Sequence, residues 1–432
     1  MMKMLFLIAT LLINCKNKEL FEDYYKEAEK YMSNWTLEQK IGQMFFPRFN
    51  DETKEEDINT TYPGGFVLFA YDFENKKEES IIKNIEYIQK LSMNSLNLPL
   101  GLAVDEEGGT VNRISSFFRK EGKFPSPQEI YNKSGINGIL TNDKEKRELL
   151  LKFKMNINLA PVADISYNSS DYIYERTLGR PPEETAKYIK DDVEGYVKDH
   201  FTCCLKHFPG YGNNLNTHYD VAYDNRPYEQ FQKEDFKTFE AGINVNVPMI
   251  LVSHNIVLCK DEKYPASISK TWHDILRNEL KFSGLILTDD LSMDAIKKYS
   301  GDESPAVLAF NAGNDILLTS DYKDHLSAVI KAAKNEKISI DTINKACRRI
   351  IAWKIKYLLE SKENKGNNND DNDNDNDNND NTVLIICLVV GGIIIFGIIL
   401  YFISKKFLCK SSKEGNDKQL NEELGSSIMD SY

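Results

Sequence analysis

Short apolar runs alternate with longer amphipathic stretches over residues 19–360, and this alternation restricts the possible folds more than any other feature of the chain. Alternating strand-like and helix-like segments favour parallel strands that are covered by helices. We therefore predict a single α/β domain, a (β/α)8 TIM-type barrel, with an open doubly wound sheet as the alternative. The eight strand candidates are GQMFFPRF, GGFVLFA, LPLGLAVDEEGG, NINLAPVADI, FTCCLKHFPG, VPMILVSHNI, GLILTDDLSM and NDILLTS.

Polar side chains stand at the carboxyl ends of several of these runs. Barrel enzymes build their active sites from residues in this position, because the carboxyl ends of all the strands open on one face. We therefore expect these side chains to lie together in one site. They are Asp105, Asp164, Lys206 with His207, Ser253 with His254, and Asp289.

Both ends of the chain carry features of an exported membrane protein. Residues 1–15 hold a lysine and then a short apolar run, which predicts a cleaved signal peptide, with a buried N-terminal helix as the alternative. Residues 383–403 form an uninterrupted apolar run, long enough for one transmembrane helix. The Asp/Asn-rich residues 361–382 before it predict a disordered stalk, and the lysines after it predict a cytoplasmic tail over residues 404–432. We expect a single-pass type I membrane protein whose globular domain is extracellular or in the lumen of a lysosome-like compartment.

Composition narrows the classes of function. The net charge of −12 argues against a nucleic-acid partner. His207, His218 and His254 lack the spacing of a metal site, so neither a metal nor a cofactor is expected. Cys203 and Cys204 lie in an apolar run and are expected to be buried packing residues, and no disulfide is indicated. Four sequences fit N-glycosylation acceptors, at Asn34, Asn59, Asn132 and Asn168.

Six motifs occur in a fixed order along the domain: AVDEEGGTVNR, LAPVADI, ERTLGRPPE, KHFPGYG with a downstream NTH, PASIS and LTDDLSM. In order and spacing they resemble those of family 3 glycoside hydrolases, and most closely the bacterial β-N-acetylglucosaminidases of peptidoglycan recycling. The β-glucosidases of that family have a second domain that supplies the acid/base carboxylate. Here the sequence runs from KYLLESKENK directly into the stalk, so the resemblance implies that the proton donor comes from a loop of the barrel itself.

The resemblance also implies the catalytic residues of a retaining hydrolase, which needs a nucleophilic carboxylate and a proton donor. Asp289 matches the nucleophile, and Asp290 beside it is expected to cap the following helix. His218 matches the proton donor, a role that suits an imidazole because it can donate and accept protons near neutral pH. The related enzymes have an aspartate two residues before this histidine, where this chain has Asn216. An Asn carbonyl can orient the imidazole but cannot stabilise its charged form as a carboxylate does.

Five further residues are implied to hold the terminal sugar: Asp105, Arg113, Arg176, Lys206 and His207. The alternative interpretation is that these residues only form buried ion pairs or hydrogen bonds at strand ends. We expect a monomeric, exo-acting retaining glycosidase that releases terminal β-linked N-acetylglucosamine through a glycosyl-Asp intermediate. The alternatives are a β-glucosidase of the same family and a surface carbohydrate-binding protein that has lost turnover. The natural β-N-acetylglucosaminide is left open between a peptidoglycan fragment, a chitin oligosaccharide and a glycan.

Overall fold

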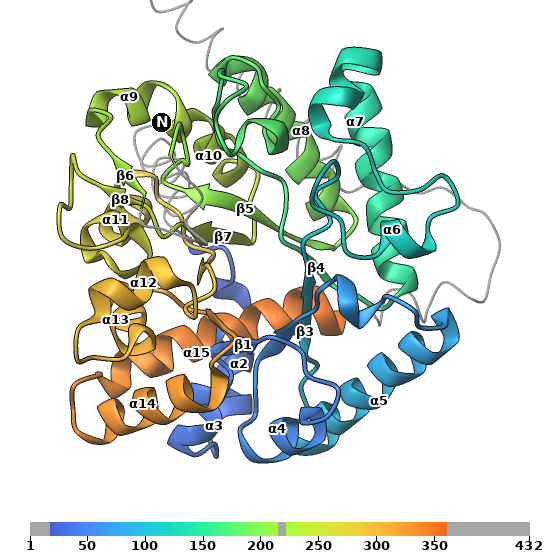
Figure 1. Ribbon diagram of the computed structural model, residues 1–432. Coiled ribbons are helices and arrows are strands. Elements are labelled where there is room, and N and C mark those ends of the chain that lie inside the picture. Colours follow the sequence, from blue (N-terminus) through green and yellow to red (C-terminus); the bar gives the residue numbers. More distant parts are fainter. Residues whose placement is uncertain (1–17, 215–221, 361–432) are drawn as a thin grey trace, which may run out of the picture. The chain divides into compact units, whose positions relative to one another are not determined.

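The computed structural model describes residues 18–214 and 222–360. Within these ranges strands and helices alternate, and Figure 1 shows the helices arranged around the outside of the strands. Each of the eight predicted runs contains one of the eight principal strands. These strands are β1 (Phe45–Pro47), β2 (Gly65–Val67), β3 (Gly101–Val104), β4 (Ile157–Asn158), β5 (Thr202–Phe208), β7 (Met249–Val252), β9 (Leu285–Thr288) and β10 (Leu317–Thr319).

Helices follow the strands, and some begin at residues that satisfy their free N–H groups. Ser126 accepts the backbone N–H of Glu129, whose carboxylate accepts the N–H of Ser126, so α7 begins with a capping box. The helices are α2 (Tyr25–Met32), α3 (Leu37–Gly42), α4 (Lys54–Thr60), α5 (Glu78–Leu96), α6 (Ser115–Phe118), α7 (Pro127–Lys152), α8 (Pro182–Lys198), α9 (Tyr228–Lys233), α10 (Asp235–Ile243), α11 (Lys270–Asp274), α12 (Asp294–Ser300), α13 (Pro305–Ala312), α14 (Tyr322–Lys334) and α15 (Ile340–Lys354).

The strands pair in parallel and in the order of the sequence. Six of them form one sheet in the order β2, β3, β4, β5, β7, β9, while β1 pairs with β10. Single parallel bridges join β1 to β2 through Arg48 and Val67, and β9 to the start of β10 through Leu287 and Ile316. A further small parallel pair, β6 (Tyr223–Asp224) with β8 (Ile256–Val257), lies outside this sheet and was not predicted. The predicted α/β class with parallel strands is confirmed.

Successive residues of a strand pack on opposite sides of the sheet, because side chains alternate along extended backbone. In β5, Cys203 and Leu205 belong to the apolar cluster that includes the residues of α5, α8 and α10. Cys204, between them, belongs to the other cluster, with Phe46 of β1 and Met249 of β7. Both faces of the sheet are therefore buried against apolar side chains. This explains why the strand sequences are continuous apolar runs rather than alternating ones. Cys203 and Cys204 are buried free thiols, as predicted.

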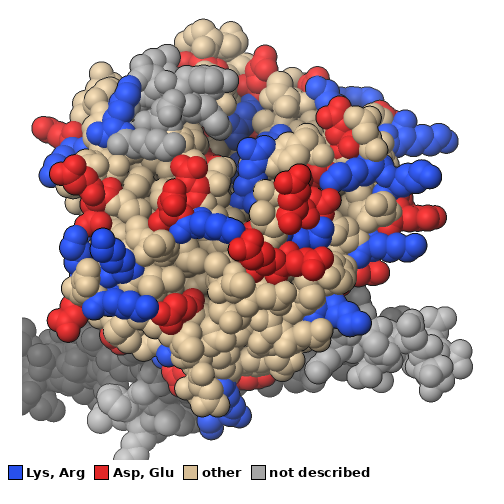
Figure 2. Space-filling view, turned by 60° about the horizontal axis from the view of Figure 1, so that its bottom comes forward, with Lys and Arg blue, Asp and Glu red and all other residues tan. Residues whose placement is uncertain are grey.

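The surface carries both signs of charge. Figure 2 shows acidic and basic side chains interspersed over one face of the domain. The four predicted glycosylation sites, whose occupancy stays a prediction, are exposed: Asn34, Asn59, Asn132 and Asn168.

No helix in the described part of the chain is both long and apolar enough to cross a membrane. The predicted signal peptide, stalk, transmembrane helix and cytoplasmic tail, at residues 1–15, 361–382, 383–403 and 404–432, lie outside the described residues.

Candidate active site

One pocket of about 410 Å³ lies at the carboxyl ends of the parallel strands. Asp105 directly follows β3, and Asp289 directly follows β9. The sequence predicted that polar side chains from different strands would meet at this end of the sheet. The structure brings six of the predicted site residues to the wall of this one pocket: Asp105, Arg113, Arg176, Lys206, His207 and Asp289.

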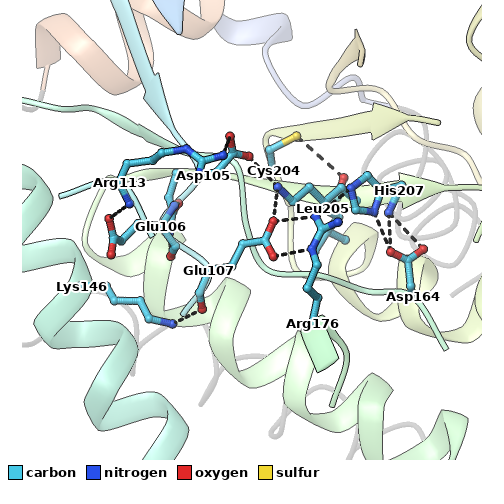
Figure 3. A network of polar contacts seen from close by, with 12 residues as sticks. Asp105, Glu106, Glu107, Arg113, Lys146, Asp164, Arg176, Cys204, Leu205 and His207 are labelled. Atoms are coloured by element: carbon cyan, nitrogen blue, oxygen red, sulfur yellow. Dashed lines mark hydrogen bonds and ion pairs between the residues drawn. The ribbon is translucent and has the colours of Figure 1, made fainter. Parts of the chain in front are cut away.

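Ion pairs connect most of these residues into a buried network. Lys206 Nζ lies 2.7 Å from Asp105 Oδ1 and 2.6 Å from Glu107 Oε1. Arg176 holds Glu107 through two bonds, 2.9 Å from Nε to Oε2 and 2.8 Å from Nη2 to Oε1. Arg113 Nη2 lies 3.3 Å from Asp105 Oδ2. Lys206 thus bridges the two carboxylates. Figure 3 shows the chain of contacts around Asp105, Glu107 and Arg176.

Burial and charge act in opposite directions on the pKa values of this network. Burial alone would raise the pKa of Asp105, but the charges of Lys206 and Arg113 outweigh it and hold that pKa below its ordinary value. Burial likewise opposes ionisation of Glu107, yet Arg176 and Lys206 lower its pKa further still. For Lys206 burial favours the neutral amine, but the two carboxylates raise its pKa. The network is therefore fully ionised near neutral pH and presents fixed charges to the pocket.

His207 is oriented by a second buried carboxylate. Its Nδ1 lies 2.7 Å from Asp164 Oδ2, and its Nε2 lies 3.2 Å from Arg176 Nη2. A guanidinium group can only donate, so Nε2 is the acceptor and the ring proton is on Nδ1, facing Asp164. The carboxylate of Asp164 also accepts the backbone N–H groups of His207 and Tyr211. The imidazole is thus held as one neutral tautomer in one orientation.

The loop after β3 is shaped by a carboxylate that does not line the pocket. Glu106 is buried and accepts the backbone N–H groups of Arg113 and Ile114, at 2.9 and 2.8 Å. Gly108 has φ of 102°, and a Cβ there would lie 2.3 Å from the Pro125 carbonyl oxygen. The loop therefore folds back tightly on itself. This fold turns Arg113 toward the pocket, although it comes eight residues after Asp105.

Asp289 and Asp290 are adjacent but differ in their surroundings. Both line the pocket, and Asp289 Oδ1 accepts the backbone N–H of Asp290 at 2.9 Å. Asp290 Oδ1 accepts the N–H groups of Ser292 and Ser320. The prediction that Asp290 caps the following helix is wrong, since α12 begins only at Asp294 and no side chain caps it. Asp290 instead ties the turn after β9 to the loop after β10.

His218 and Asn216 lie outside the described residues, as does the neighbouring Asp220. Within residues 18–214 and 222–360, no three His, Cys, Asp or Glu side chains form a group that could hold a metal ion.

Two residues of the site were given no specific role from the sequence. Glu107 stands in the motif EEGG, which reads as a generic turn, and the only local signal for it is its place two residues after Asp105. Asp164 was placed at a strand end, but nothing in the sequence indicated that it would hold His207. Both act through partners that are distant in sequence, Arg176 for Glu107 and His207 for Asp164.

Comparisons with known proteins agree with the motifs. The model of the family described as "Glycosyl hydrolase family 3 N terminal domain" matches residues 36–353. A β-hexosaminidase of Nitrosomonas eutropha is 28% identical over 67% of this chain and 83% of its own length. A β-hexosaminidase of Idiomarina loihiensis is 30% identical over 59% of this chain and 75% of its own length.

A solved structure shares the fold. It is that of a glycoside hydrolase family 3 β-N-acetylglucosaminidase from a Paenibacillus species, with a TM-score of 0.70 and 25% identity. The match covers 76% of this chain and 63% of that one. By its sequence and its fold, this chain belongs to glycosyl hydrolase family 3.

Proposed function

We propose that this protein is an exo-acting β-N-acetylglucosaminidase that retains the configuration of the released sugar. One observation carries the proposal: Asp289 lines the same pocket as the five residues predicted to hold the terminal sugar. The relatives named β-hexosaminidase support the same substrate class. A pocket of about 410 Å³ suits a small ligand such as one sugar ring.

In the proposed first step, an Asp289 oxygen bonds to the anomeric carbon and the bond from that carbon to the leaving oxygen breaks. The leaving oxygen takes its proton from His218. In the second step His218 removes a proton from water, the water oxygen bonds to the anomeric carbon, and Asp289 leaves as a carboxylate. The assignment of His218 rests on the family resemblance alone, and Asn216 is its proposed orienting partner.

The ion network would hold the sugar through charged hydrogen bonds, which are stronger than neutral ones. Asp105 keeps a free lone pair on each oxygen after its bonds to Lys206 and Arg113, so it can accept from two sugar hydroxyl groups. Arg176 and Lys206 donate to Glu107 and thereby stay fixed before the sugar arrives. Such preorganisation lowers the cost of ordering side chains on binding.

We also propose that the eight strands close into a (β/α)8 barrel. The sequential strand order, the pairing of β1 with β10 and the two single bridges support a closed ring. A doubly wound sheet would instead reverse its strand order at a switch point.

Membrane anchoring is the third part of the proposal, with a signal peptide, a stalk and one span before a cytoplasmic tail. It is supported by the apolar run at 383–403 and the lysines that follow it. We expect the full chain to stay in the membrane fraction at high pH. A form that begins near Lys16 and ends near Glu360 should be soluble, monomeric and folded. A full chain that washes off the membrane would contradict the anchor.

The activity is tested with chromogenic β-N-acetylglucosaminide and β-glucoside. We expect hydrolysis of the first, and its loss in Asp289→Asn, because an amide cannot form the covalent ester. A slow fluorinated N-acetylglucosaminyl fluoride should label a peptide containing Asp289. Asp302→Asn is the control and should keep activity within about tenfold, since Asp302 is exposed and does not line the pocket.

Two other results would redirect the proposal. A preference for the β-glucoside would make the protein a β-glucosidase. Binding of N-acetylglucosamine without hydrolysis of either substrate would favour the carbohydrate-binding alternative.

A further inference from the structure

A second cavity adjoins the candidate active site. It has a volume of about 850 Å³ and shares two wall residues, Arg48 and Ser320, with the first pocket. The other walls come from residues 47–57, which lead from β1 into α4, from residues 71–76 after β2, and from residues 320–324 at the start of α14. Figure 1 shows α4 and α14 at the same end of the domain. A substrate longer than one sugar could extend from the first pocket into this second one.

The wall of the second cavity is rich in acidic side chains. Six carboxylates line it, against three basic side chains. Two of the basic groups have partners: Arg48 lies over the rings of Phe69 and Tyr71, and Lys323 lies 3.2 Å from Glu56. The carboxylates are Asp51, Glu52, Asp57, Asp72, Asp321 and Asp324.

One of these carboxylates is buried without a full set of compensating contacts. Asp57 is 6% exposed, and while its Oδ2 accepts from Thr53 Oγ1 at 2.7 Å, its Oδ1 accepts no hydrogen bond. The nearest cation to that oxygen is Lys323 Nζ, at 3.9 Å. Asp72 is equally buried. Its Oδ2 accepts the backbone N–H of Phe69 at 2.8 Å, and burial still raises the pKa of Asp72 to about 6. Negative charge is therefore costly here until a cation enters, which is the condition for attracting a cationic ligand.

We propose that this second cavity binds the leaving-group part of the substrate and selects a positively charged amino sugar there, namely glucosamine with a free amine. This inference rests on the proposed function, since it takes the first pocket to hold the terminal N-acetylglucosamine. Arg48 and Ser320, on the wall that the two cavities share, stand beside the junction of the two sugars. The substrate class is then a partly deacetylated N-acetylglucosamine oligosaccharide. An aglycone that carries carboxylates, such as a peptide-bearing sugar acid, is disfavoured because like charges repel.

Binding tests the inference without requiring turnover. The full chain in detergent is titrated near pH 6.5 by calorimetry with two trimers that share a terminal N-acetylglucosamine. One is N-acetylglucosaminyl-di-glucosamine and the other is tri-N-acetylglucosamine. We expect the amine form to bind about tenfold more tightly at low salt, with the advantage reduced at high salt because exposed charges are screened. The double variant Glu52→Gln, Asp324→Asn should lose most of that advantage. Both residues are exposed, so the variant should fold normally.

The matched control removes the same charge elsewhere. Glu262→Gln with Asp302→Asn, two exposed carboxylates that do not line the cavity, should keep the preference. Equal binding of the two trimers by the unmodified chain would overturn the inference. An equal loss of preference in both double variants would overturn it too, because the effect would then come from net charge alone.

Steady-state kinetics provide a second test of the preference for a cationic sugar. The ratio of kcat/KM for N-acetylglucosaminyl-glucosamine over di-N-acetylglucosamine should exceed one and fall several-fold in the Glu52→Gln, Asp324→Asn variant. It should stay unchanged in the Glu262→Gln, Asp302→Asn variant. A ratio of one beside normal chromogenic activity would contradict the inference and leave the proposed function standing. Failure on every substrate would contradict the proposed function, and the titrations alone would then decide whether the cavity selects a cationic sugar.

Discussion

Asp164 Oδ2 lies 2.7 Å from His207 Nδ1, on a carboxylate that is fully buried. The same carboxylate accepts two backbone N–H groups, from His207 and Tyr211, so it fixes the loop as well as the ring. His207 in turn accepts from Arg176, which is bound to Glu107. Through this chain of contacts, a residue that does not line the pocket determines the orientation of groups that do.

We expect Asp164→Asn to reduce kcat/KM by about 10²–10⁴ with the fold retained. The amide NH2 group would face a donor, which forces the proton of His207 onto Nε2 and against the guanidinium of Arg176. A wrong tautomer of this kind costs about 10⁴ in the rate of serine proteases. Steady-state kinetics with circular dichroism measure both properties.

The control for this prediction is Asp315→Asn. Asp315 is also a buried carboxylate, paired with Arg277 and Arg349, but it stands before β10, at the opposite ends of the strands. It should lose stability and keep kcat. If both variants lost activity equally, Asp164 would have only a general structural role.

Glu107→Gln should destabilise the domain by about 3–5 kcal/mol, because it leaves Lys206 and Arg176 buried with one carboxylate fewer. The low pKa of Glu107 contributes stability that is present above its unfolded value near 4.5 and is lost as the pH falls toward its folded value. The loss of unfolding free energy in the variant, measured by urea unfolding, should therefore be larger at pH 7 than at pH 3. Glu145→Gln, which breaks an exposed pair with Arg119, should change the midpoint little. Equal effects of the two substitutions would contradict the buried network.

The site residues that could be predicted from the sequence are those whose position depends on the residues next to them in the chain. Asp105 and Asp289 follow apolar strands directly, and the carboxyl ends of parallel strands meet whatever the rest of the chain does. Glu107 could not be located in this way, because its partner Arg176 is 69 residues away along the chain. The cap predicted at Asp290 failed for a related reason. Its carboxylate accepts from Ser320, 30 residues away, in place of the helix N–H groups.

The strands themselves were predictable as apolar runs but not in length. The run NINLAPVADI yields a strand of only two residues, Ile157–Asn158. Pro161 cannot donate to the strand ladder and so interrupts it, and beyond it Val162 forms only a single bridge, to Lys206 of β5. The second cavity depends on three segments that are far apart in sequence, so no local pattern indicated it.

Asn216→Asp should raise turnover and move the pH optimum upward. If His218 is the proton donor, a carboxylate two residues before it would stabilise the charged imidazole and raise its pKa, which an amide cannot do. The pH dependence of kcat/KM from pH 4 to 8 measures the shift. Asn213→Asp places the same charge five residues before His218 and should have a smaller effect. An unchanged rate and pH profile in Asn216→Asp would remove His218 from the proposed mechanism.

Lys354→Met should stabilise the domain by about 2 kcal/mol at pH 6 and not at pH 9. Lys354 is fully buried, with Nζ 2.7 Å from Gln43 Oε1, and burial lowers its pKa to about 7. Between pH 7 and the unfolded value of 10.5 the unfolded chain binds more protons, so the stability of the unmodified domain rises with pH in that window. The gain in stability from removing the charge is therefore complete below pH 7 and shrinks above it. At every pH, the Gln43 oxygen that loses its partner offsets part of this gain. Urea unfolding at both pH values tests this prediction, with Lys90→Met, at an exposed lysine, as the control. A gain in stability that did not depend on pH would show that Lys354 is not charged in the folded domain at pH 6.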